Sequence, residues 1–97
     1  MARKVFKGEK RYVRALVKRR DGEDFALGTA TFEVYAPAVA AAIDTGSAMV
    51  EEHEVFFLLD TTASKYVSGN TYRAYMEVRV VNEPKVLRNQ QMVEIVP

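Results

Sequence analysis

The chain has 97 residues, of which 48% are hydrophobic and 28% charged, with a formal net charge of +1. This length suits a single domain over residues 1–97, and the composition argues against general disorder. The chain has no cysteine, so disulfides and thiolate metal sites are excluded. No apolar run is long enough for a membrane span, and we expect no signal peptide.

The basic residues are concentrated near the N-terminus. Residues 1–20 contain nine Lys or Arg and one acidic residue, whereas the rest of the chain contains five basic and twelve acidic residues. Such a split favours an acidic partner or head-to-tail contact between copies. The simpler interpretation is a solvated hairpin end, whose charges keep its edge strand from pairing with another chain. The candidates for a basic contact are Arg14, Lys18, Arg19 and Arg20.

The first third of the chain predicts two strands. Residues 1–9 show no sustained period and predict a basic arm or a short edge strand. Apolar and polar residues then alternate over residues 11–18, and the Asp-Gly pair at residues 21–22 favours a hairpin. The second strand covers residues 25–35 and ends before Pro37, which cannot donate to a central ladder.

The middle of the chain leaves a choice between helix and strand. Residues 38–43 are rich in alanine and ambiguous, and residues 44–47 indicate a turn. Residues 55–59 form a continuous apolar run after a polar turn, and we favour a strand there. The alternative is an α+β fold, with a helix over residues 47–60 packed on a four-stranded sheet.

The clearest pattern in the sequence covers residues 71–81, where side chains of alternating polarity predict a half-buried strand. A turn at residues 82–85 leads to the last strand, residues 86–96, which the polar residues 88–91 interrupt. Short strands at roughly ten-residue spacing predict an all-β fold, an antiparallel sandwich of about seven strands.

The start of the penultimate strand carries the motif Gly69-x-x-Tyr72-x-Ala74. It resembles the tyrosine corner of immunoglobulin-like (Ig-like) domains, with Tyr72 as the corner and Ala74 as a core position. Alanine stands where antibody-type domains have cysteine, and the chain has no tryptophan, so an antibody-type member is excluded.

With this motif, the order of elements resembles the small Ig-like domains of tailed-phage structural proteins, including the N-terminal domain of phage baseplate upper proteins. The resemblance implies an architectural role in a phage or prophage particle, in the virion or the host cytoplasm, without catalysis. Partners would be other virion proteins or copies of the chain in a homo-oligomer. Assembly would use the basic N-terminal end and the strands Val55–Leu59 and Met92–Val96, whose two faces are both apolar.

Little in the sequence favours catalysis or metal binding. His53 lies among Glu51, Glu52 and Glu54, a pattern more typical of a solvated turn than of converging metal ligands. The serines fall in turn segments, and the separated glycines form no phosphate-binding loop. We therefore predict that the chain is not an enzyme and holds neither a cofactor nor a metal.

Aromatic residues outside the predicted core offer another kind of surface. Tyr35, Phe56 and Tyr75 are expected on faces opposite the core, where tyrosine often contacts partner proteins. The alternative function is a binding module for carbohydrate or nucleic acid, using these tyrosines or the basic N-terminal segment. No contact with a membrane is expected.

Overall fold

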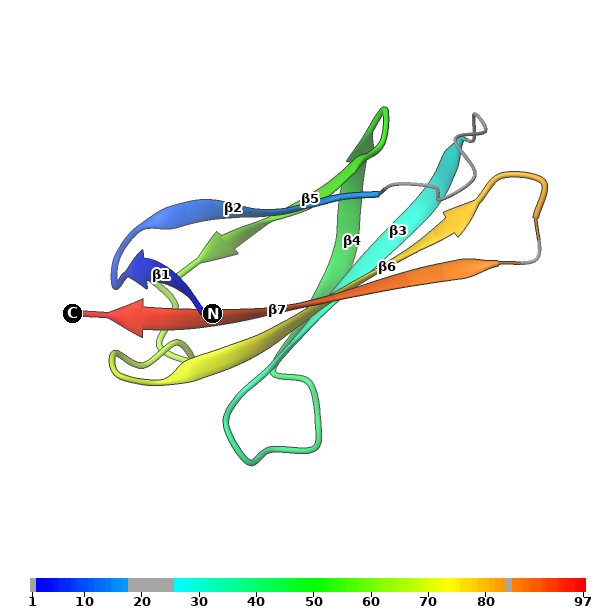
Figure 1. Ribbon diagram of the computed structural model, residues 1–97. Helices are drawn as coiled ribbons and strands as arrows, with labels where there is room; N and C mark the ends of the chain where they lie inside the picture. The colour runs from blue at the N-terminus through cyan, green and yellow to red at the C-terminus, as the bar shows by residue number, and fades with distance from the viewer. Residues whose placement is uncertain (1, 18–25, 84) are drawn as a thin grey trace.

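The computed structural model describes residues 2–17, 26–83 and 85–97 (Figure 1). This part of the chain contains seven strands and no helix, which confirms the all-β class. The strands are β1 (Arg3–Phe6), β2 (Lys10–Leu16), β3 (Leu27–Tyr35), β4 (Asp44–Glu51), β5 (Glu54–Asp60), β6 (Thr71–Val80) and β7 (Val86–Val96). The alternative helix over residues 47–60 is wrong, because β4 and β5 occupy that stretch and meet at a short turn.

All seven strands belong to one mixed sheet, in the order β1-β7-β6-β3-β4-β5-β2. Neighbouring strands are antiparallel, except that β1 runs parallel to β7. The expectation of a purely antiparallel fold is therefore wrong for this pair. Two strands that follow each other in sequence, β2 and β3, are not neighbours in the sheet, so the predicted hairpin between them is also wrong. The Asp-Gly pair of that hairpin lies outside the described residues.

Strand β4 changes partner along its length. Its first part, Asp44–Ala48, pairs with β3, and its last part, Met49–Glu51, pairs with β5. The sheet therefore curls, and Phe32 of β3 comes face to face with Phe57 of β5, with ring centroids 4.1 Å apart and planes 3° apart. Side chains between the two halves of the curled sheet form the core. A sheet with no second layer facing it could not bury these apolar side chains.

The core is built by side chains that alternate along the strands. Strand β6 contributes most, because every second residue from Tyr72 to Val80 is buried, as its pattern predicts. The other fully buried large side chains come from five further strands and one connection: Val5, Val13, Val34, Val55, Phe57, Leu59, Tyr66, Val93 and Ile95.

Two local expectations fail for the same reason, namely pairing with the preceding strand of the chain. Residues 44–47, predicted as a turn, belong to β4, where Gly46 lies opposite Phe32. A Cβ atom at Gly46 would come within 2.9 Å of the Phe32 ring, so the glycine makes room for that ring. The polar residues 88–91 do not interrupt the last strand, because β7 pairs with β6 continuously from Val86 to Glu94.

Candidate interaction surfaces

The Tyr72 side chain holds the connection between β5 and β6 from inside the fold. Tyr72 is 1% exposed, and its hydroxyl donates to the Lys65 carbonyl at 3.1 Å and accepts from the Val67 N–H at 2.7 Å. The Tyr66 ring packs edge-on against it, with centroids 5.2 Å apart, and the Tyr66 hydroxyl donates to Asp44 at 2.7 Å. Burial, followed by that hydrogen bond, raises the pKa of Tyr66 above its ordinary value.

The other two residues of the motif have backbone and packing roles. Gly69 adopts a positive φ of 92°, a conformation that favours glycine, and its N–H donates to the Ile95 carbonyl at 2.7 Å. Ala74 is buried on the inner face of β6, opposite Gln91 of β7. Neither residue offers a side chain to a partner.

The outer face of β3, β6 and β7 carries two adjacent tyrosines flanked by arginines, which we call the arginine–tyrosine row: Arg73, Tyr35, Tyr75 and Arg88. The two tyrosine rings meet edge to face, with centroids 5.5 Å apart. The guanidinium carbons of Arg73 and Arg88 lie 5.3 Å and 4.3 Å from the centroids of Tyr35 and Tyr75, respectively. The row thus brings together two of the predicted aromatic contacts and adds two arginines that the sequence analysis did not single out.

Glutamates balance the charges of this row. Arg88 forms an ion pair with Glu77 at 3.6 Å, and the Tyr35 hydroxyl donates to Glu33 at 2.6 Å. Because of this hydrogen bond, the pKa of Tyr35 is raised above its ordinary value. The rings and cations of the row therefore interact mainly with each other and with neighbouring carboxylates.

A second surface lies on the outer face of β4, β5 and β2, and we call it the apolar face. It consists of Tyr12 and Leu16 from β2, Met49 from β4, and Phe56 and Leu58 from β5. Four of these side chains are 42–62% exposed, which is unusual for large apolar residues: Tyr12 (42%), Leu16 (62%), Met49 (44%) and Leu58 (43%). Cross-strand pairing places Tyr12 beside Leu58 and Met49 beside Phe56, so the apolar side chains are adjacent.

One arginine lies within the apolar face. The Arg14 guanidinium is 5.3 Å from the centroid of the Tyr12 ring and 4.9 Å from that of Phe56, and the two rings meet edge to face. Arg14 also forms an ion pair with Glu54. The structure thus brings Arg14 and Phe56 together, but places them on other strands of the sheet's outer face than Tyr35 and Tyr75.

The remaining predicted contacts differ from this arrangement. Lys18, Arg19 and Arg20 lie outside the described residues. The strands Val55–Leu59 and Met92–Val96 were expected to offer two apolar faces, but their inner side chains belong to the core. Only their outward residues, such as Leu58, are available to a partner.

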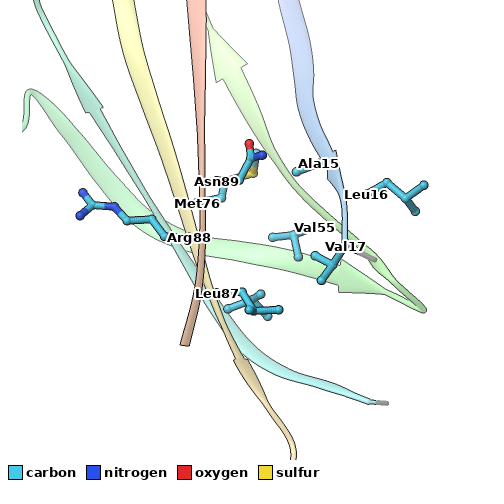
Figure 2. Close-up of a pocket in the computed structure, with 9 residues that line it drawn as sticks. Ala15, Leu16, Val17, Val55, Met76, Leu87, Arg88 and Asn89 are labelled. Carbon is cyan, nitrogen blue, oxygen red and sulfur yellow. The ribbon is translucent and has the colours of Figure 1, made fainter. Parts of the chain in front are cut away.

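A cavity lies where the sheet nearly closes, between β2 and β7, and we call this region the seam. The Gln91 side chain on β7 donates to the Arg14 carbonyl on β2 and so bridges the seam. Beside this bridge is a cavity of about 170 Å³, lined by Ala15, Leu16, Val17, Val55, Met76, Val78, Leu87, Arg88 and Asn89. In Figure 2, Val17, Val55 and Leu87 point toward one another, whereas Leu16 and Arg88 point away.

Within the part of the chain that the structure describes, no three His, Cys, Asp or Glu residues are grouped as they would be to hold a metal ion. In the same residues, no helix is long and apolar enough to cross a membrane. The chain matches no protein-family model, no curated protein and no solved structure.

Proposed function

We propose that this protein is a non-enzymatic assembly module of the Ig-like sandwich type, which associates with copies of itself through the apolar face. The observation that carries the proposal is the group of large apolar side chains on β2, β4 and β5, exposed side by side. Contiguous apolar patches of this kind on a folded domain are typical of protein contacts. The aromatic residues and the arginine within the patch are types enriched at such contacts.

The course of the chain supports the Ig-like part of the proposal. β4 passes from one half of the curled sheet to the other, and the Phe32 and Phe57 rings stack between the halves. The Tyr72 hydroxyl bonds to the backbone a few residues upstream, as the corner tyrosine of Ig-like domains does. A parallel pair between the first and last strands is also compatible with two facing layers.

Charge complementarity favours a second copy as the partner. Next to its aromatic side chains, the apolar face carries an ion pair between the cation Arg14 and the anion Glu54. In a contact with two-fold symmetry, each residue faces a patch identical to its own. The Arg14 of one copy can then approach the Glu54 of the other, so the contact buries no charge without an opposite one.

Sedimentation velocity over a dilution series tests this proposal. We expect the wild-type protein to dissociate on dilution and Leu58→Glu to remain monomeric, because the new carboxylate would be buried without a partner. Thr31→Glu is the matched control, since Thr31 is exposed on the outer face of β3 and should leave association unchanged. A wild-type monomer at the highest concentration, or equal association of both variants, would contradict the proposal.

The biological setting of the proposal rests on the resemblance to Ig-like domains of tailed-phage structural proteins. An assembly module without chemistry of its own suits a repetitive particle, in which identical contacts recur. If this setting is right, the genes next to the one that encodes this chain encode virion proteins. A neighbourhood of unrelated metabolic genes would argue against it.

A further inference from the structure

Strand β1 covers the edge of β7 only at one end. Its register places Arg3 beside Val93 and Phe6 beside Val96. The rest of that edge, from Val86 to Met92, has no strand neighbour among the described residues. Continued backward from Arg3 in the same register, a strand would lie along this uncovered edge, beside the residues of β7 that line the cavity in the seam.

Strand β2 presents a second edge across the seam, and no other strand among the described residues pairs with it. The Val17 N–H donates to His53 on the β5 side, whereas the Arg14 carbonyl points the other way, toward Gln91. Because backbone groups of successive residues point to opposite edges, those of Tyr12 and Leu16 share the edge of Arg14. Gln91 thus gives Arg14 the hydrogen bond that a neighbouring strand would otherwise supply.

The cavity between these edges has the size and lining of a site for one large apolar side chain. Its volume is about 170 Å³, and its inner wall is made by Val17, Val55, Met76, Val78 and Leu87. An apolar protein cavity of about 150 Å³ holds a benzene molecule, which is similar in size to a leucine or phenylalanine side chain. The inner residues of a strand added over the seam would point into this space.

The rim of the seam carries one arginine on each side. Arg14 on β2 and Arg88 on β7 have exposed side chains, and each already pairs with a glutamate of its neighbouring strand, Glu54 and Glu77. An added strand would place its outward residues between these two arginines. Acidic residues at those positions would gain favourable interactions, and basic residues would be repelled.

We propose that the seam receives an extended segment of a different protein chain, which continues the line of β1 between β7 and β2. Such a segment would carry apolar residues at the positions that face the cavity and acidic residues at the outward positions, a form of strand addition. A second copy of this chain is a poor donor, because its edge strands β1 and β2 are rich in Lys and Arg. The seam borders the apolar face, because Arg14 and Leu16 belong to both, whereas Leu58 belongs to the apolar face alone.

The register of β1 and β7 allows a sharp test with extensions fused before Met1. Extended backward, it places the second residue before Met1 beside Asn89 and the fourth beside Leu87, both on the inner face. The extension Leu-Glu-Leu-Glu therefore directs its leucines inward, and Glu-Leu-Glu-Leu directs them outward at identical composition and charge. Fusion supplies the segment at high effective concentration, so even weak insertion is measurable.

We expect the inward extension to raise the melting temperature by about 5 °C or more, because it fills the cavity and pairs the edge of β7. Hydrogen exchange of the amides from Val86 to Met92 should slow at least tenfold in the same protein. The outward extension should change neither quantity. Equal melting temperatures for the two extensions would overturn the proposal.

A third extension, Leu-Lys-Leu-Lys, tests the acidic character of the segment. It should stabilise the protein less than Leu-Glu-Leu-Glu, and the difference should shrink at high salt. Equal stabilisation by the two would overturn the acidic part of the proposal. All measurements are repeated in the Leu58→Glu background, so that failure of self-association through the apolar face and failure of the seam are told apart.

Discussion

The Tyr72 hydroxyl supplies backbone groups of the β5–β6 connection with hydrogen bonds that a strand or helix would otherwise supply. It bonds both Lys65 and Val67 in a connection that has no strand or helix of its own, and the buried Tyr66 ring supports it from the side. With these contacts, the connection is attached to the core at two aromatic residues. The segment between β5 and β6 is therefore fixed by side chains rather than by backbone ladders.

Replacing Tyr72 by phenylalanine should destabilise the fold without changing its shape. The Lys65 carbonyl and the Val67 N–H would both lose their partner, and a buried polar group left unpaired costs about 1–3 kcal/mol. Chemical denaturation monitored by circular dichroism measures this loss. Tyr12→Phe is the control, because Tyr12 is exposed and should stay within about 0.5 kcal/mol of wild type. Equal stability of the two variants would contradict a role for the Tyr72 hydroxyl.

Sequence reasoning at this scale succeeds where the local pattern is strong and fails where a distant neighbour decides. Tyr66 was overlooked because it lies in a polar segment, yet its ring is fully buried against Tyr72. Gly46 predicts a turn by its residue type, since glycine is common in turns. Its actual reason is the Phe32 ring on the adjacent strand, which no local pattern reveals.

At the scale of strands, β1 is short but integral to the core. Val5 is fully buried, whereas its neighbour Phe6 is 58% exposed. Four consecutive residues pair with β7, and the following turn leads directly into β2. Removing residues 1–9 would thus remove a core side chain and uncover all of the β7 edge, so such a truncation would report on folding rather than on assembly.

Val5→Ala tests whether β1 is part of the fold or an arm on its surface. We expect a loss of about 2 kcal/mol in the free energy of unfolding, because two buried methyl groups are removed and a small cavity remains. Phe6→Ala removes a larger but exposed side chain and should cost much less. Urea denaturation of both variants measures the difference. A smaller loss for Val5→Ala than for Phe6→Ala would mean that β1 detaches in solution.

The polar residues 88–91 show why strand boundaries are harder to predict than strand existence. Asn89 and Gln91 lie on the inner face of β7, where the pattern demands apolar residues. They are tolerated because that part of β7 borders the seam, and there Gln91 bonds the β2 backbone. The alternating pattern of β6 carried the correct prediction of a strand, but the pairing order of the strands depends on contacts between residues far apart in the chain.

At the scale of the whole molecule, the two surfaces on the outer face of the curled sheet differ in which side chains they leave exposed. On the arginine–tyrosine row, the rings are covered by arginines and the charges are balanced by glutamates. On the apolar face, large side chains remain exposed to solvent. Residues of both surfaces can be identified from the sequence, but they cannot be assigned to separate surfaces. The curl of the sheet decides which strands lie on the same side of the molecule.

We expect no tight binding of single-stranded oligonucleotides at physiological salt. The net charge is only +1, and Arg14 and Arg88 already pair with glutamates. Nonspecific binding of this kind depends on cations that neutralise phosphates, and it weakens steeply as salt rises. Fluorescence anisotropy over a salt series measures it, and alanine at Lys18, Arg19 and Arg20 isolates the contribution of that segment. Submicromolar affinity with a steep salt slope would contradict the expectation.

The parallel pairing of β1 and β7 has a mechanical consequence. Tension applied between the start of β1 and the end of β7 pulls these two strands past each other along their length. Their hydrogen bonds then bear the force in shear, all at once, instead of opening one after another as in a zipper. A module gripped at these two points would resist stretching far better than its few backbone bonds suggest, which is a useful property in any structure that transmits force.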